Sequence, residues 1–171
     1  RNGVYHSIDD GVSWRHANTG LGIKLKNRLV MEGRYVYSCT ENGLYRSSDN
    51  GRSWNLLGLE GHVVTSVVSY SGMLLASTGT QGVFRSTNGG MTWTTSNNGF
   101  GNLTINGLEI NGEYIFAPTA FGVYRSSDGG SNWISTNSWI SNYFIYDICF
   151  LNNFMFACGA EMFVSTDNGA N

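Results

Sequence analysis

Residues 126–133 read Ser-Ser-Asp-Gly-Gly-Ser-Asn-Trp. The frame Ser-x-Asp-x-Gly-x-x-Trp, which we call the box, occurs again at 7–14 and 47–54, with Asn for Asp at 86–93, and without its Trp at 165–171. The box serines are 40, 39, 40 and 39 residues apart. Five copies in register at one period indicate a repeat protein, in which each repeat of about 40 residues is one structural unit.

The residue types of the box are those of a tight turn. An Asp or Asn side chain accepts N–H groups of its own turn, a Ser hydroxyl does the same, and Gly reaches positive φ without a Cβ clash. The Trp opens the next strand, where its ring can be buried and its indole N–H can find a partner. The sequence therefore predicts structural turns at Ser7, Asp9, Gly11, Trp14, Ser47, Asp49, Gly51, Trp54, Ser86, Asn88, Gly90, Trp93, Ser126, Asp128, Gly130, Trp133, Ser165, Asp167 and Gly169.

Short apolar runs alternate with turn residues in every period. In the fourth repeat, runs at 105–110 and 114–117 flank Asn-Gly, which is a strong hairpin cue, and a third run at 122–125 leads into the box. The fifth repeat has the corresponding runs at 145–150, 154–157 and 162–164. No apolar stripe with helical spacing persists. Four short antiparallel strands per repeat are typical of β-propeller blades.

The predicted fold is therefore all-β, a β-propeller of four-stranded antiparallel blades with one box turn in each repeat. The chain is divided into a partial blade at 1–22, blades at about 23–60, 61–100 and 101–140, and a partial blade at 141–171. Two arrangements stay open. The partial blades can complete one blade of a closed four-bladed ring, or the chain can be an arc of a ring of six or more blades. The ends, one within a repeat and one within a box, favour the arc and predict a segment of a longer protein.

The box resembles the Asp-box, or bacterial neuraminidase repeat, of β-propellers, and the resemblance covers essentially the whole chain. Families that share it include sialidases, xyloglucan-degrading glycosidases, sortilin-type receptors, photosystem II assembly-factor-like proteins and many secreted bacterial proteins. In these families the box is a structural turn that generally lies away from the catalytic or binding face. The resemblance therefore implies the propeller fold and leaves the chemistry open.

The composition excludes several classes of partner. Charged residues make up only 13% of the chain, the formal net charge is −2, and there is no basic run, so we expect no nucleic-acid partner. No apolar run approaches the length of a membrane span, so we expect no direct membrane insertion. A protein or a glycan, or another part of a larger chain or complex, is the expected partner.

Catalytic and metal sites are not predicted. The resemblance to sialidases would require three converging arginines, but Arg46, Arg85 and Arg125 take the same place in successive repeats, where the repeat geometry holds them apart. Asp147 and Glu109 fall in predicted innermost strands, where an acid is more often hydrated than catalytic. The three histidines lack the spacing of metal ligands. We predict no catalytic residue, no cofactor and no metal.

The three cysteines also lack metal spacing. Cys149 and Cys158 flank a predicted turn and can pair under oxidation. The simpler interpretation makes all three, with Cys39, small buried apolar residues.

Three aromatic residues lie on the predicted connections between blades, namely Phe100, Trp139 and Tyr143. They can stack on sugars or bury in a protein partner, or they can pack between adjacent blades. The sequence favours a non-catalytic binding or scaffold propeller of a secreted or cell-surface bacterial protein, which engages a protein or glycan through loops at one ring face. The alternative is a fragment of a sialidase- or xyloglucanase-like glycoside hydrolase whose catalytic residues lie outside this segment. A sortilin-like receptor domain is a third interpretation.

Overall fold

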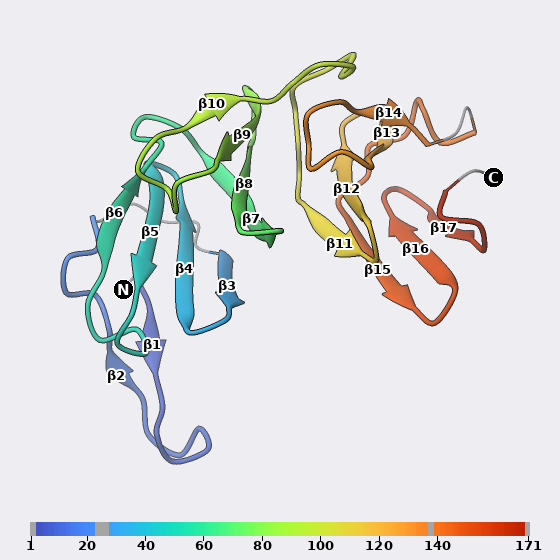
Figure 1. Cartoon of the computed structure of the whole chain (residues 1–171). Helices are drawn as coiled ribbons and strands as arrows, with labels where there is room; N and C mark the ends of the chain where they lie inside the picture. Colours follow the sequence, from blue (N-terminus) through green and yellow to red (C-terminus); the bar gives the residue numbers. More distant parts are fainter. Residues whose placement is uncertain (1–2, 23–27, 137–138, 170–171) are drawn as a thin grey trace. The chain divides into compact units, whose positions relative to one another are not determined.

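The computed structural model describes residues 3–22, 28–136 and 139–169, and all of its regular elements are β-strands (Figure 1). The chain divides into two units, Arg1–Val64 and Thr65–Asn171, which we describe separately. The segment 23–27, where the second predicted blade begins, lies outside the described residues.

The first unit holds two antiparallel sheets. One is two-stranded, with β1 (Tyr5–His6) and β2 (Arg15–His16). The other is four-stranded, in the order β3 (Arg28–Glu32), β4 (Tyr35–Thr40), β5 (Gly43–Ser47) and β6 (Asn55–Gly58).

The second unit holds three antiparallel sheets, and β7 begins at its boundary. In each sheet the strands follow chain order. The first sheet contains β7 (Val64–Tyr70), β8 (Met73–Thr78), β9 (Gly82–Ser86) and β10 (Thr94–Thr95), and the second contains β11 (Glu109–Asn111), β12 (Tyr114–Thr119), β13 (Gly122–Ser126) and β14 (Ile134–Ser135). The third contains β15 (Asp147–Leu151), β16 (Phe154–Cys158) and β17 (Met162–Ser165). The prediction of an all-β fold with four-stranded antiparallel sheets is confirmed.

Each sheet is a simple meander, so successive turns alternate between its two ends. The box joins the third strand to the fourth, and the turn between the first two strands lies at the same end, which we call the box end. The turn between the second and third strands and the connection to the next sheet lie at the opposite end, which we call the loop end. At the box end, Ser71 and Gly72 have φ of 49° and 79°, the consecutive positive values that suit a tight hairpin.

A second recurring turn lies at the loop end. The Oγ1 of Thr40, Thr78 and Thr119 donates to the carbonyl oxygen of Gly43, Gly82 and Gly122, at 2.8, 2.9 and 2.9 Å. The three threonines are almost fully buried. The pairing between β16 and β17 places Cys158 opposite Met162 at this end, and no threonine occurs there.

The predicted strand at 105–110 is wrong in its first half, because β11 begins only at Glu109. The N–H of Ile105 donates to the carbonyl of Thr78 in the preceding sheet, and that of Asn106 donates to the carbonyl of Pro118. Residues 104–106 thus pair with 118–120 beside β12 in a register that is shifted by one residue from the β11–β12 ladder, and the strand is interrupted before Glu109. The first strand of the last sheet likewise begins at Asp147, two residues later than predicted.

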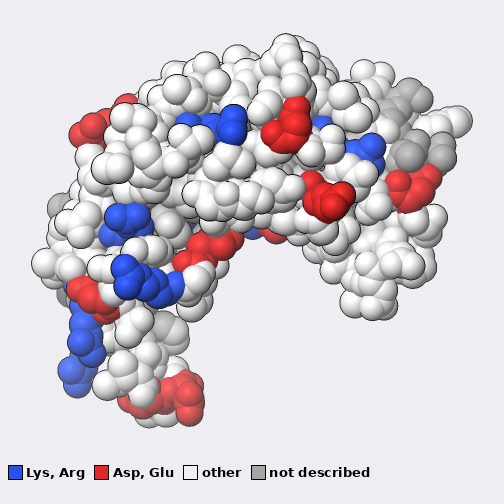
Figure 2. Space-filling model, in the orientation of Figure 1, with Lys and Arg blue, Asp and Glu red and all other residues white. Residues whose placement is uncertain are grey.

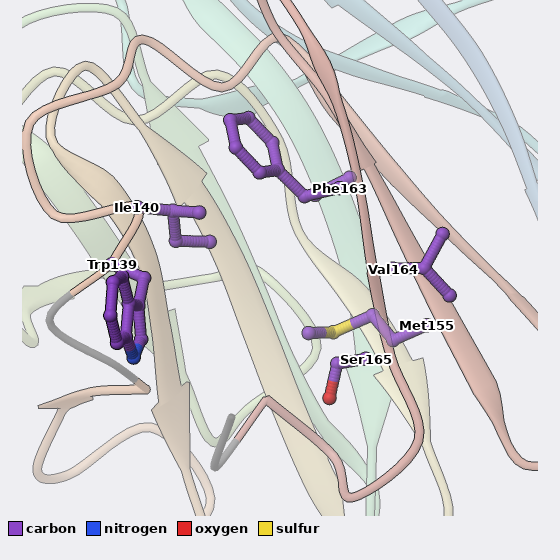
Figure 3. A pocket seen from close by; sticks show the side chains of 7 residues that line it. Trp139, Ile140, Met155, Phe163, Val164 and Ser165 are labelled. Atoms are coloured by element: carbon purple, nitrogen blue, oxygen red, sulfur yellow. The ribbon is translucent and has the colours of Figure 1, made fainter.

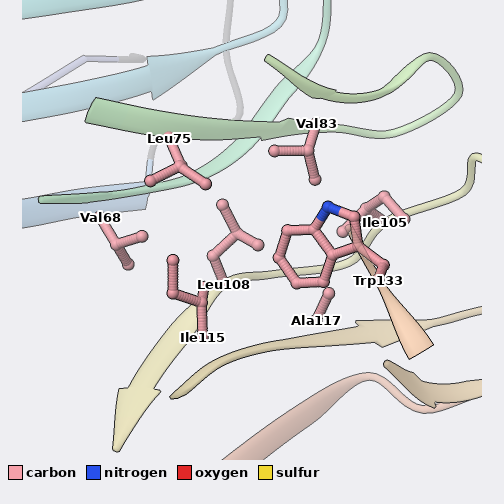
Figure 4. Packing of buried hydrophobic residues seen from close by; sticks show 8 residues of the cluster. All are labelled: Val68, Leu75, Val83, Ile105, Leu108, Ile115, Ala117 and Trp133. Carbon is pink, nitrogen blue, oxygen red and sulfur yellow. The ribbon is translucent and has the colours of Figure 1, made fainter. Parts of the chain in front are cut away.

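The cores lie between successive sheets. In the second unit, Val68, Leu75 and Val83 of one sheet meet Ile105, Leu108, Ile115, Ala117 and Trp133 of the next (Figure 4). Trp133 is 2% exposed and donates its indole N–H to the carbonyl of Ser96, 37 residues earlier, at 2.9 Å. In the first unit, Trp54 is 3% exposed and donates to the carbonyl of Ala17, also 37 residues earlier, at 2.7 Å.

The predicted burial of the box Trp is wrong for Trp14. This side chain is 62% exposed, and its indole N–H donates to the carbonyl of Gly11 in its own box. The partner carbonyls of Trp54 and Trp133, by contrast, belong to the preceding repeat. Trp93 is half-buried.

Candidate functional site

The box turns share one hydrogen-bond pattern. In all five copies the Ser hydroxyl donates to Oδ1 of the Asp or Asn two residues later, at 2.7 to 2.9 Å. The same hydroxyl oxygen accepts the N–H of the box Gly, at 2.8 to 2.9 Å. In the first four copies Oδ1 also accepts the N–H of the residue before the Trp, at 2.9 to 3.0 Å. All of these bonds are made within the turn itself.

The bonds stabilise the ionised carboxylates. Hydrogen bonds from Ser13, then from Ser7, lower the pKa of Asp9 to about 2, and those from Ser53 and Ser47 do the same for Asp49. Burial raises the pKa of Asp128, but hydrogen bonds from Asn132 and Ser126 outweigh it and the net direction is downward. A carboxylate held ionised in this way is a poor general acid or base near neutral pH.

The arginines before the box serines have local partners. The Arg46 guanidinium lies 4.7 Å from the centre of the Tyr35 ring, and that of Arg125 lies 4.5 Å from the Tyr114 ring. Arg125 also donates to the carbonyl of Asn168, at 3.1 Å. In the same way Arg85 donates to the Met73 sulfur, at 2.9 and 3.2 Å, and to Ser131 Oγ, at 3.3 Å. Arg85 and Arg125 thus each also reach the box of the following sheet.

The two acids considered from the sequence, Asp147 and Glu109, each begin the first strand of a sheet. Asp147 is exposed at the start of β15 and accepts the N–H of Ile148, at 3.0 Å, while Glu109 is half-buried at the start of β11. Across the described ranges, no three His, Cys, Asp or Glu side chains come together as metal ligands would.

The cysteines are all free thiols. Burial raises the pKa of the Cys39 thiol to about 12, so this residue is an inert core group. Cys149 and Cys158, which were expected to be buried, are exposed. The strand register places Cys158 opposite Asp147, and Cys149 opposite Phe156, so the two thiols are diagonal neighbours and no disulfide joins them.

Exposed aromatic side chains gather at the loop end of the last two sheets. We call Phe121, Tyr143, Phe144 and Tyr146 the aromatic surface; they are 48, 36, 42 and 61% exposed. Two backbone hydrogen bonds join the connection between β14 and β15 to the turn between β12 and β13. The N–H of Gly122 donates to the carbonyl of Tyr143, and the N–H of Ile145 donates to the carbonyl of Thr119. The Phe144 and Tyr146 rings lie 4.9 Å apart. The backbone under these rings is therefore fixed, while the rings face solvent.

The three aromatic candidates have different surroundings. Phe100 is half-buried and stacks on Trp133, with ring centres 4.8 Å apart, so for this residue the packing alternative holds. Tyr143 rests edge-on against Phe163, at 4.9 Å, and leaves part of its ring in solvent. Trp139 is 80% exposed.

Trp139 stands at the edge of an apolar pocket of about 130 Å³ (Figure 3). The pocket lies between the connection that carries Trp139 and Ile140 and the last sheet. Its remaining lining residues are Met155, Ala157, Phe163, Val164 and Ser165.

Sequence reasoning missed Phe121, Phe144 and Tyr146. A comparison of the repeats could have found two of them, since Thr104 and Asn106 stand 40 residues before Phe144 and Tyr146. Polar residues at these places in one connection and aromatic ones in the next signal a specialised loop.

Charge is sparse at the surface. Figure 2 shows several Lys and Arg side chains close to one another at the lower left of the view, with Asp and Glu among them, and a large uncharged area elsewhere on this face. Among the described residues, the structure has no helix with the length and hydropathy of a membrane span.

Comparisons with known proteins give structural neighbours only. No family model and no curated protein matches the sequence. The extracellular domain of a one-component system of B. thetaiotaomicron matches with TM-score 0.78 and 17% identity, over 96% of this chain and 25% of that one. An ancestral GH74 enzyme matches with TM-score 0.75 and 20% identity, over 91% and 24%. YCF48 bound to D1 peptide matches with TM-score 0.67 and 19% identity, over 96% and 58%.

The chain is β-propeller-like in fold. These neighbours are β-propeller-like proteins, and at such identities the likeness concerns the fold alone. The chain spans between about a quarter and three fifths of their lengths.

Proposed function

We propose that this chain is a non-catalytic binding module, a segment of an Asp-box β-propeller from a secreted or cell-surface bacterial protein. It engages its ligand through the loops of its sheets, and the box residues serve as structural turns. The observation that carries the proposal is the aromatic surface, four exposed rings on a backbone fixed by hydrogen bonds.

A protein partner suits this surface best. Aromatic residues are enriched and charged residues depleted at the centres of protein interfaces, where a few rings supply most of the binding energy. The two phenylalanines and two tyrosines form such a group, and the turn at 120–122 and the connection at 141–146 that carry them hold no charged residue, although the exposed Asp147 follows Tyr146 directly. A neighbour in fold, YCF48, is described with a bound peptide, which supports a protein ligand as the first candidate.

A glycan is the second candidate, favoured by a separate hollow at the box end. This hollow has a volume of about 320 Å³ and is lined by Asn111, Gly112, Glu113, Tyr114, Asn152, Asn153, Thr166 and Asn168. Amide side chains beside a tyrosine ring suit neutral sugar hydroxyls, which need donors and acceptors in equal measure. An extracellular neighbour domain is compatible with either ligand.

The test screens the 171-residue chain against a peptide display library and a glycan array. We expect selected peptides whose affinity falls at least about tenfold in the double variant Phe144→Ala/Tyr146→Ala, as expected for interface anchors. Met91→Ser is the matched control, since Met91 is 80% exposed on a box turn.

The two candidates give different results. Binding of glycans that is lost in Asn153→Ala and kept in the aromatic double variant would move the function to the polar hollow. Peptide binding that the double variant leaves unchanged would refute the role of the aromatic surface. Hydrolysis of an array glycan by the purified chain would contradict the non-catalytic role.

A further inference from the structure

The aromatic surface stands on a backbone framework that also occurs one repeat earlier. The N–H of Gly82 donates to the carbonyl of Leu103, and 40 residues later the N–H of Gly122 donates to the carbonyl of Tyr143. The turn and the connection are therefore the same, but the side chains at three of their positions differ. They are Gln81, Leu103 and Thr104 in the earlier repeat, and Phe121, Tyr143 and Phe144 in the later one.

The framework leaves these positions open to solvent even where another connection lies beside them. The earlier connection contacts the later one, because Asn106 Nδ2 donates to the carbonyl of Ile145, at 2.6 Å. Gln81 is nevertheless exposed, and Leu103 is 37% exposed. Since the earlier repeat folds in the same way with Gln and Thr at two of the three positions, the fold does not require aromatic rings there. The rings of the later repeat are therefore free to serve a ligand.

The unit that carries the aromatic surface is acidic. Residues 65–171 contain two arginines, no lysine or histidine, and six acidic residues, which gives a formal charge of −4. Both arginines precede a box serine, at the box end. Arg85 donates there to Ser131 Oγ, and Arg125 donates to the carbonyl of Asn168. The cations of this unit are therefore engaged at the end opposite to the aromatic surface.

Two of the carboxylates lie at the loop end of the last sheet. Asp147 directly follows Tyr146 and pairs with Cys158, and Glu161 lies in the turn that follows Cys158. Both acidic side chains are exposed. The turns and connections at the loop end of this unit contain no lysine or arginine. A partner with positive charge is therefore complementary to this end of the unit.

The chain itself shows at the box end how its rings pair with a cation. The Arg125 guanidinium lies 4.5 Å from the centre of the Tyr114 ring, and the Arg46 guanidinium lies 4.7 Å from that of Tyr35. A planar guanidinium stacks on an aromatic face and is attracted by the charge distribution of the ring. The loop end of the second unit has exposed rings and carboxylates without such a partner.

We propose that the partner segment that binds the aromatic surface presents an arginine side chain to the Phe144 and Tyr146 rings. These rings lie 4.9 Å apart, are tilted by 48°, and are 42 and 61% exposed. The Asp147 and Glu161 carboxylates add attraction at the same end of the sheet. The inference rests on the proposed function, because it names the chemistry of the partner that the aromatic surface engages.

The test uses the 171-residue chain with ¹³C-labelled phenylalanine and tyrosine rings. The probes are three peptides, acetyl-Leu-X-Leu-amide, in which X is arginine, citrulline or norleucine. Citrulline keeps the shape of arginine without its charge, and norleucine keeps only an apolar chain. We expect the arginine peptide to shift the Phe144 and Tyr146 ring signals in a saturable way, and the other two peptides to bind about threefold more weakly or worse.

Two sets of variants locate the site. Phe144→Ala/Tyr146→Ala should remove the preference for arginine over citrulline and weaken the binding of the arginine peptide about tenfold. Asp147→Asn/Glu161→Gln, which keeps the rings, should reduce that preference and its sensitivity to salt. Glu113→Gln is the matched control and should change neither, because Glu113 is an exposed carboxylate in a turn at the box end.

The outcomes separate this inference from the proposed function. Equal binding of the three peptides that is lost in the aromatic double variant would keep the surface as a docking site and overturn the role of arginine. Arginine-peptide binding that the double variant leaves unchanged would place the cation elsewhere and overturn the inference. No shift with any peptide up to its solubility would also overturn it, whereas the proposed function is decided by the display selection, whose peptides need not contain arginine.

Discussion

The first and fourth boxes form the same turn, but their tryptophans differ in burial. In both, the Ser hydroxyl bonds the Asp carboxylate and the Gly N–H with nearly equal lengths. Trp14 is nevertheless 62% exposed, whereas Trp133 is 2% exposed. The turn is a local structure, and the burial of its Trp is not.

The cause lies in the partner of the indole. The indole N–H of Trp133 donates to the carbonyl of Ser96 and its ring stacks on Phe100, both in the preceding repeat. The indole N–H of Trp14 instead donates to the carbonyl of Gly11 in its own box. The second and fourth boxes therefore complete their own sheets and also join those sheets to the ones before them. We expect a box to stabilise the fold fully only where its turn forms and its Trp also packs against the preceding sheet.

The largest expected effect is the difference between the two tryptophans. Trp133→Ala should lower the free energy of unfolding by about 3–5 kcal/mol, because it removes a buried ring from between two sheets. Trp14→Ala should cost about 0.5 kcal/mol, as is usual for an exposed side chain. Urea unfolding of both variants checks the difference. Equal losses would show that Trp14 is buried in solution.

A smaller difference is expected at the box glycines. Gly11 and Gly130 have φ of 87° and 83°, so an alanine is strained at either site. A Cβ at Gly130 would also overlap the Leu75 side chain, whereas at Gly11 its nearest neighbour is a Trp14 ring carbon at 3.7 Å. Gly11→Ala should cost about 1 kcal/mol and Gly130→Ala about 2–3 kcal/mol.

Thermal unfolding of the two alanine variants measures this difference. The comparison isolates packing, because the backbone strain is nearly the same at the two sites. If the two midpoints fell equally, strain alone would account for the loss, and the contact with Leu75 would have no energetic weight.

The same contrast explains what could be predicted from the sequence. The all-β fold followed from the 40-residue period and from runs of alternating strands and turns, which are local signals. Packing between blades was one of two alternatives for Phe100, and the sequence could not decide between them, because the outcome depends on the Trp133 ring, 33 residues later in the sequence. The aromatic surface was found only in part, since the exposure of Phe121 depends on which connection lies beside its turn. The pocket could not be predicted either, because it depends on how the connection that carries Trp139 lies against the last sheet.

The smallest expected effect concerns acid. The pKa of Asp9 and of Asp49 is lowered from 3.8 to about 2 in the folded state, so the unfolded chain binds more protons between these values. The stabilisation from each carboxylate is fully present above about pH 4 and is lost as the pH falls toward about 2. Asp49→Asn should remove the contribution of that site to the acid dependence.

The third box supplies the pattern for this variant. Asn88 accepts the N–H of Thr92 through Oδ1, at 3.0 Å, and donates through Nδ2 to the Thr92 hydroxyl, at 2.8 Å. Ser53 presents the same two groups to Asp49, at 2.9 and 2.6 Å, and its hydroxyl can accept as well as donate. Asp49→Asn should therefore keep the turn, be somewhat less stable than the parent chain at pH 7, where the contribution of the carboxylate is missing, and lose less stability than the parent between pH 7 and pH 2. Urea midpoints at the two pH values decide the matter: parallel losses in both chains would mean that the Asp49 carboxylate does not contribute to acid unfolding.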